Sequence, residues 1–315
     1  MRGHEVCLRE AAVETHTGTA SRVAGAMLAP YCESESSEPI IQELGLRSLE
    51  LWRQFDPTLQ VCGTLVVATR RDEAELRRYA RMTKGHVRLD SAGIRHLEPT
   101  LPDHFQHGLY FADEAYVSPR GVMQRLIGKL RSMDVDVRFS SPVAEPIWLA
   151  APAGGIVIDC RGLAARSDRL PLRGVRGEMA VVHLPSLSLS HPVRLLHPRF
   201  PIYVVPWGGD TYMIGATMIE SEAHGAVTMR SAIELMSSAV AVHPGFLDAR
   251  IIELSVGVRP AFDDNIPKIT PRGKCISVNG AYRHGFLLAP VLAEIVADHL
   301  EQGLSIPSDL ARQRG

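Results

Sequence analysis

The chain has 315 residues, and its 34 Lys plus Arg residues nearly balance 35 Asp plus Glu residues, for a formal net charge of -1. Neither sign is gathered into a long block, which argues against a nucleic-acid-binding or polybasic membrane surface. Hydrophobic residues make up 45% of the chain, enough for one large core or two medium ones. The most apolar stretch, 286–300, contains Glu294 and Asp298, and the first ten residues are too charged for a signal peptide. We therefore expect a cytoplasmic protein without a transmembrane segment.

Cysteine and histidine usage also excludes some classes of site. The five cysteines are scattered, odd in number and form no C-x-x-C pair. This favours a reducing compartment over a disulfide framework or a zinc site. The 13 histidines show no metal-ligand spacing, so no metal is expected.

The first half of the chain predicts alternating strands and helices. The apolar run 6–8, which precedes the acidic Glu10, predicts a short strand. Helices are predicted to open at Ser37 and Pro39, at Asp72, and at Ser118 and Pro119. Ser118 and Pro119 suit the N-cap and first helical positions. Further strands are predicted at 64–68 and 135–139.

The second half predicts mainly strands. Segments 155–159, 178–183, 201–206, 211–218 and 275–279 are apolar and rich in β-branched residues. Gly208, Gly209 and Asp210 predict a hairpin turn between two of them. A last helix is predicted to start at Pro290. Because parallel-type and antiparallel-type segments alternate, we expect an α/β protein with two domains threaded through each other.

Two features near the start of the chain suggest a nucleotide site. Glu10 sits where a dinucleotide-binding fold places the acidic residue that binds the ribose, although a solvated strand end is the simpler interpretation. A run of small residues follows, which would let a planar ligand or a phosphate approach the backbone. A helix start packed on a sheet is the alternative. No G-x-G-x-x-G motif occurs in the chain.

Five segments together resemble the D-amino-acid oxidase family of FAD flavoproteins, most of all its glycine oxidase branch. They are ASRVAGAMLAP, RGVRGEM, VPWGGDTYMIGATM, VGVRPAFDDNIPKI and NGAYRHGFLLAP, in the family's order and at roughly its spacing. The likeness extends from Arg2 to about Gly303. Family members begin with a strand, a Gly-rich turn and a helix, so the chain resembles a member whose first βα unit is missing. We expect a misplaced start or a truncation, and weak FAD binding by the chain as it stands.

The resemblance implies a fold and a domain division. It implies a Rossmann-like parallel sheet that binds FAD, interleaved with an antiparallel-sheet substrate domain. The FAD-binding domain is expected at 1–44, 106–168 and 251–315, and the substrate-binding domain at 45–105 and 169–250.

The resemblance also implies the site residues. Arg259 matches the arginine that pairs with the substrate carboxylate, a task suited to the two parallel donors of a guanidinium. Arg283 matches a second active-site arginine, and Tyr203 is expected to line the pocket. Contacts with FAD are expected from Glu10, Ser21, Ala24, Gly25, Ala26, Met27, Val143, Gly162, Gly280, Tyr282, Arg283, His284, Gly285, Phe286 and Leu287.

The implied activity is FAD-dependent oxidation of glycine or another small amino acid to the imine, supplying the thiazole branch of thiamine biosynthesis. A related flavin amine or D-amino-acid dehydrogenase and a non-catalytic remnant are the alternatives. Arg22, Val23, Arg161, Leu163 and Trp207 depart from the family pattern, which leaves substrate size and flavin contacts open. Whether the protein forms a homo-oligomer also stays open.

Overall fold

The computed structural model describes residues 3–143, 147, 151–167 and 170–312. Its helices are α1 (Pro39–Phe55), α2 (Glu73–Met82), α3 (Ser91–Leu97), α4 (Pro119–Ser132), α5 (Met229–Val242) and α6 (Gly285–Gln302). Its strands are β1 (Cys7–Arg9), β2 (Met27–Leu28), β3 (Thr64–Ala68), β4 (Val87–Asp90), β5 (His107–Phe111), β6 (Ala115–Tyr116), β7 (Asp136–Arg138), β8 (Val157–Asp159), β9 (Arg173–His183), β10 (Val193–Leu196), β11 (Ile202–Gly208), β12 (Thr211–Gly215), β13 (Ile219–Glu220), β14 (Arg250–Ala261), β15 (Lys268–Arg272) and β16 (Cys275–Asn279).

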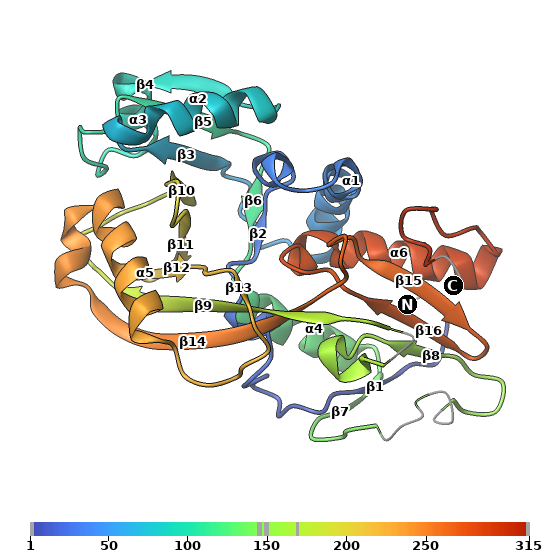
Figure 1. Ribbon diagram of the computed structural model, residues 1–315. Helices are drawn as coiled ribbons and strands as arrows, with labels where there is room; N and C mark the ends of the chain where they lie inside the picture. Colours follow the sequence, from blue (N-terminus) through green and yellow to red (C-terminus); the bar gives the residue numbers. More distant parts are fainter. Residues whose placement is uncertain (1–2, 144–146, 148–150, 168–169, 313–315) are drawn as a thin grey trace.

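A nine-stranded mixed sheet forms the larger part of the molecule. Its strand order is β13-β9-β12-β11-β10-β3-β5-β4. β14 pairs with the edge of β9 opposite to β12 and β13. β11 and β12 form the hairpin predicted around Gly208, Gly209 and Asp210. The long pair β9–β14 runs from this sheet toward the rest of the chain (Figure 1). Residues at the far end of the β9–β14 pair therefore lie next to the smaller part of the molecule.

The smaller part contains the parallel pairings that a nucleotide-binding domain requires. β1 pairs in parallel with β7, and β8 pairs in parallel with β16, which pairs antiparallel with β15. Helix α6 lies above β15 and β16 and against α1 (Figure 1). The predicted α/β fold, with parallel and antiparallel sheets interleaved, is confirmed.

The last helix does not begin where the sequence analysis placed it. Helix α6 begins at Gly285, and Pro290 lies inside it. Pro290 has no N–H to donate to the carbonyl one turn earlier, that of Phe286. The indole Nε1 of Trp52 donates to that carbonyl instead, at 2.8 Å. A proline is thus tolerated because α1 supplies the missing donor.

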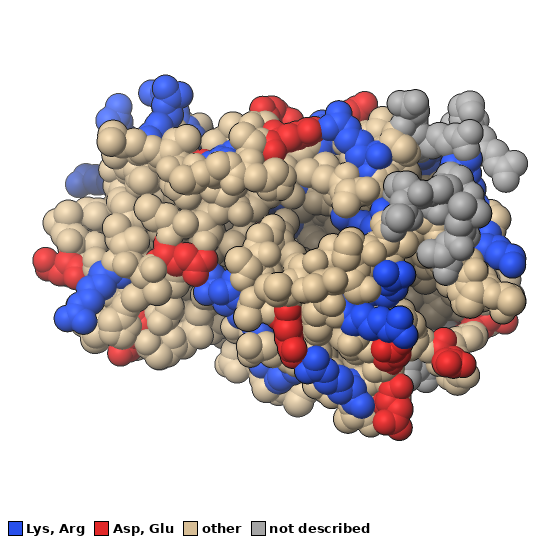
Figure 2. All heavy atoms as spheres, turned by 90° about the horizontal axis from the view of Figure 1, so that it is seen from below, with Lys and Arg blue, Asp and Glu red and all other residues tan. Residues whose placement is uncertain are grey.

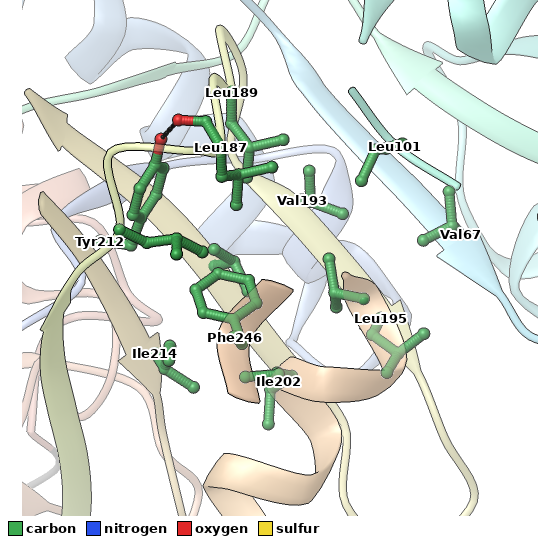
Figure 3. Close-up of a cluster of buried hydrophobic side chains, with 14 of the residues drawn as sticks. Val67, Leu101, Leu187, Leu189, Val193, Leu195, Ile202, Tyr212, Ile214 and Phe246 are labelled. Atoms are coloured by element: carbon green, nitrogen blue, oxygen red, sulfur yellow. Dashed lines mark hydrogen bonds between the residues drawn. The ribbon is translucent and has the colours of Figure 1, made fainter. Parts of the chain in front are cut away.

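Each of the two parts of the molecule has its own hydrophobic cluster. One lies between α5 and the large sheet and includes Leu195, Ile202 and Phe246; Figure 3 shows Tyr212 at its edge, where the hydroxyl donates to the carbonyl of Leu187. Another joins α1 to α6. Each cluster fixes helices on a sheet, which is the usual layered packing of such domains.

The sheet pairings bear on the expected domain boundaries. β5 and most of β14 belong to the nine-stranded sheet, although 106–168 and 251–315 were assigned to the FAD-binding domain. We propose that the boundaries fall after Phe111 and near Ala261 instead.

No helix of the described residues is long and apolar enough to cross a membrane. On the face in Figure 2, basic and acidic side chains are interspersed, in keeping with the balanced composition.

Candidate active site

Arg259 is a partly buried arginine near the end of β14. Its guanidinium lies over Gly177 of the neighbouring strand β9, where an added Cβ would come within 2.2 Å of Nη2. Its Nη1 donates to the carbonyl of Thr217 at 3.1 Å. Among the described residues no carboxylate lies within 4.0 Å of it, and desolvation lowers its pKa. A partly desolvated guanidinium without a contacting counter-ion favours an anionic ligand.

Arg283 lies close by but already has an acidic partner. Its Nε lies 3.0 Å from Oε2 of Glu33, and its Nη2 donates to the hydroxyl of Ser36. Glu33 also contacts Arg194, at 3.4 Å, and accepts a short hydrogen bond from Tyr203. Burial alone would raise the pKa of Glu33, but the charges of the two arginines outweigh it and lower that pKa to about 2. Glu33 is therefore a carboxylate at any working pH.

The segment Thr217–Met218 connects the two arginines. The carbonyl of Thr217 contacts Arg259, while Sδ of Met218 lies 3.7 Å from Nη1 of Arg283 and 3.6 Å from the hydroxyl of Tyr282. The two guanidinium groups thus lie against consecutive residues. The structure brings Arg259, Arg283 and Tyr203 close together, through Thr217, Met218 and Glu33.

Two glycine turns lie beside this site. Gly162 and Gly280 both have positive φ, of 61° and 78°. The Asn279 side chain joins them: its Nδ2 donates to the carbonyl of Gly162 at 2.9 Å and its Oδ1 accepts from the N–H of Gly280 at 2.8 Å. The N–H of Tyr282 then donates to the carbonyl of Pro260, which sets this loop next to Arg259.

The run of small residues packs against the same end of β14. Val23 and Ala20 lie so close to Gly257 that a Cβ there would be 2.6 Å from the Val23 side chain. Ser21 and Val23 bound a short 3-10 helix, and Ala24 ends it. This part of the run thus packs against a strand, as the alternative interpretation expected, and its contact with a ligand stays a prediction.

The end of the run leads into the sheet. A Cβ at Gly25 would lie 3.2 Å from Cε of Met213. Ala26 has a φ of 51°, a conformation that non-glycine residues adopt rarely and mostly where structure or function demands it. Met27 packs near Met213 and Tyr203, which connects the run to the arginine site.

The amino end of α6 completes the neighbourhood. The His284 ring accepts from Nε of Arg283 at 3.4 Å and contacts Ser37; burial lowers its pKa to about 4, so it is neutral at pH 7. A Cβ at Gly285 would meet nothing within 4 Å, whereas Leu287 is buried against Gly45. Phe286 and Leu287 lie in the first turn of α6, where backbone N–H groups have no intrahelical partner. These N–H groups, rather than the side chains, are therefore the atoms that a ligand could contact.

Glu10 and Val143 lie apart from the arginines, at the end of β1. Glu10 follows β1 directly, and its carbonyl accepts from the N–H of Ser141, close to the partly buried Val143. Its carboxylate accepts from the N–H of Ala12 at 2.8 Å. Glu10 is thus at the carboxyl end of a parallel strand, the edge at which nucleotides bind in such sheets.

Comparison with known proteins decides the family. Residues 1–299 match the family of FAD-dependent oxidoreductases designated DAO. The chain belongs to this family. It is 46% identical over 305 residues to a putative thiamine biosynthesis oxidoreductase ThiO of Rhizobium etli, covering 96% of this chain and 91% of that protein. The bifunctional protein ThiO/ThiG of Trichormus variabilis is 25% identical over 91% of this chain and 48% of its own length. The crystal structure of glycine oxidase from Geobacillus kaustophilus superposes with a TM-score of 0.84, 24% identity and coverage of 100% and 94%.

As a DAO family member, the chain is a flavoprotein that uses FAD. The residues present fit part of that cofactor. Gly285 leaves open space at the amino end of α6, and the positive φ of Gly162, Gly280 and Ala26 shapes the backbone near the arginines. Glu10 provides an acidic strand end for a ribose. The sequence contains no G-x-G-x-x-G motif that could form a phosphate-binding loop.

Several residues of the site escaped the sequence analysis. Asn279 and Met218 lie within two of the five family segments but were not singled out, and Glu33 and Arg194 lie outside those segments. One hydrogen bond of Asn279 runs to Gly162, a residue that the sequence does not connect with it. For Glu33 the available signal was its position three residues after the Met-Leu-Ala-Pro run. Of the residues that depart from the family pattern, Arg161 pairs with Asp159 at 2.9 Å.

Proposed function

We propose that this protein oxidises glycine or another small amino acid at the amine-bearing carbon, giving the imine. The observation that carries the proposal is Arg259, a partly buried guanidinium that has no acidic partner among the described residues and lies beside the glycine turns and the amino end of α6. The names of its relatives, ThiO and glycine oxidase, support this substrate class and a role in thiamine biosynthesis.

The chain's own residues position the substrate. Arg259 would hold the carboxylate through two parallel N–H donors, which fixes both the distance and the plane of that group. Thr217 holds the guanidinium from behind, and Gly177 leaves the space that it fills. When bound, FAD supplies the hydride acceptor for the C–H bond of the amine-bearing carbon. The neutral amine donates its lone pair to form the C=N bond, so no protein base is required at the carbon.

Replacement of Arg259 tests the proposal. We expect the FAD-loaded wild type to oxidise glycine, and Arg259→Met to lower kcat/KM roughly 100-fold or more, since loss of one partner of a buried charged pair costs about 2–5 kcal/mol. Arg259→Lys should recover little, because an ammonium lacks the planar fork. Gly177→Ala should raise KM by displacing the guanidinium, with the melting temperature nearly unchanged.

Arg95→Met is the matched control. Arg95 is half exposed on α3 and pairs with the exposed Asp103 at 3.0 Å. Its loss should leave glycine kinetics unchanged. Kinetics of Arg259→Met within threefold of wild type would contradict the proposal. Peroxide formation measured alongside distinguishes oxygen from another electron acceptor.

A further inference from the structure

Arg283 ends an alternating series of charges that runs from the active site to the surface at α2. Arg283 pairs with Glu33 at 3.0 Å, and Glu33 with Arg194 at 3.4 Å. Arg194 pairs with Glu35 at 3.8 Å, and Glu35 with Arg78 at 2.7 Å. Arg78 closes the series with Glu75 at 3.0 Å. We call these six residues the charge ladder.

The ladder carries no net charge, since its arginines and glutamates alternate in equal number. Its inner members are buried: the side chains of Arg194 and Glu33 are 7% and 13% exposed. The Arg194 guanidinium also lies between the rings of Tyr79 and Tyr203, at 5.1 and 5.0 Å. A guanidinium so enclosed cannot turn away, so Glu33 stays fixed next to Arg283.

The two active-site arginines are both cationic and differ in whether a carboxylate contacts them. Arg259 lacks an acidic partner among the described residues, whereas Arg283 is neutralised by Glu33. A substrate that brings one carboxylate satisfies Arg259. A substrate with a second anionic group would place that group near Arg283. There Glu33 already contacts Nε of the guanidinium, and its carboxylate repels a further negative charge.

We propose that Glu33 is a specificity-determining residue that reserves Arg283 and so restricts the site to amino acids with a single carboxylate. The inference rests on the proposed function for its substrate class. Glu33 acts through Arg283 and is a positioning residue. Removal of its charge, with its size kept, should release Arg283 to bind a second carboxylate.

The experiment compares glycine with iminodiacetate, which adds one carboxylate, in FAD-loaded wild type and Glu33→Gln. In the wild type kcat/KM should favour glycine. In the variant the iminodiacetate-to-glycine ratio of kcat/KM should rise at least tenfold, mostly through KM. A parallel loss of both activities with an unchanged ratio would show that Glu33 only supports the structure, and would overturn the proposal.

Glu35→Gln is the matched control. It removes the next glutamate of the ladder, which contacts Arg194 and Arg78 but not Arg283. It should leave the ratio unchanged. An equal rise in Glu35→Gln would mean that total ladder charge, rather than reservation of Arg283, sets the preference, and would also overturn the proposal.

A binding measurement separates this inference from the proposed function. Acetate and malonate are titrated against the holoprotein with thermal unfolding as the readout. Wild type should be stabilised at similar concentrations of both, and Glu33→Gln at about tenfold lower malonate than acetate. If glycine is not oxidised yet this pattern appears, the activity fails and the specificity stands. If wild type already prefers malonate tenfold, the inference fails, even where Glu33→Gln does not fold.

Discussion

Glu114 shows how strongly burial can act on one side chain. It has no exposed surface, and its Oε1 accepts from the N–H of Cys32 at 2.6 Å. Burial is the largest influence, with the charge of Glu33 adding to it, and together they raise the pKa of Glu114 to about 8. At neutral pH this carboxyl keeps its proton, directly beside the site.

This pKa sets a direction for the dependence of stability on pH. The unfolded chain releases the proton near pH 4.5, whereas the folded protein keeps it to about pH 8. Stability from this group is therefore fully present below pH 4.5 and is lost as the pH rises to 8, at up to about 1.4 kcal/mol per pH unit.

Glu114→Gln should remove the loss of folding stability that Glu114 causes between pH 4.5 and pH 8. The amide oxygen can still accept from Cys32 but does not titrate. We expect the variant to unfold at higher denaturant concentration than wild type at pH 8, and to show little difference at pH 4.5. Chemical unfolding at both pH values measures this, and a variant that is less stable at pH 8 would contradict the raised pKa.

At the scale of elements, α6 depends on α1 for its integrity. Pro290 leaves the carbonyl of Phe286 without an intrahelical donor, and Trp52 supplies one. The same two helices bury a common apolar cluster that includes Val291 and Leu292. The pairing thus fixes the register between helices that present the amino end of α6 to the site.

A double-mutant cycle measures this dependence. Trp52→Phe removes the indole donor and should cost about 1–2 kcal/mol, because a buried carbonyl is left without a partner. Pro290→Ala restores an intrahelical N–H. In the Pro290→Ala background, Trp52→Phe should cost clearly less, giving a coupling energy of about 1 kcal/mol by denaturant unfolding. Additive effects would show that the Phe286 carbonyl does not link the two helices.

Sequence reasoning was most reliable for elements with local signals. Ser118 accepts from the N–H of Gly121 at the start of α4, as an N-cap should. The prediction that the last helix starts at Pro290 was wrong. Local rules place a proline at a helix start, but the indole of Trp52 supplies the hydrogen bond that Pro290 cannot make inside α6. The helix predicted to open at Ser37 and Pro39 has Pro39 as its first residue and Glu38 as its N-cap, and Ser37 contacts His284.

Tertiary pairing explains what could not be predicted. The role of Glu33 depends on Arg194 and Arg283, which the fold alone brings together. Arg259 could be found because a family motif surrounds it, but its lack of an acidic partner is a property of the packed structure. The domain boundaries that we propose near β5 and β14 depend on pairing in the same way, since partner strands far along the chain decide which sheet a strand joins.

At the scale of the whole molecule, stability is unevenly distributed. β9 is buried along nearly its whole length, whereas β1 and β7 form an isolated pair with mostly exposed residues. Short exposed ladders open at low free energy, and long buried ones open only with global unfolding.

Hydrogen exchange should reveal this difference. We expect amides in β1 and β7 to exchange at least 100-fold faster than those in the centre of β9. Added FAD should slow exchange around Glu10 and leave β9 unchanged, since Glu10 is the predicted ribose contact. Mass-spectrometric exchange with and without FAD measures both, and protection that avoids residues 8–12 would remove Glu10 from the cofactor site.

The parallel pairing of β3 with β10 has a consequence for biosynthesis. One edge of β3 pairs with β5 at 107–111, but the other edge finds its partner only at 193–196, and β9 pairs with β14 only at 250–261. The ribosome therefore has to reach residue 261 before the nine-stranded sheet is complete, and one edge of the apolar β3 stays unpaired until residues 193–196 are made. Nascent chains of this kind are natural clients of chaperones, and translation speed between β3 and β14 governs how long that exposure lasts.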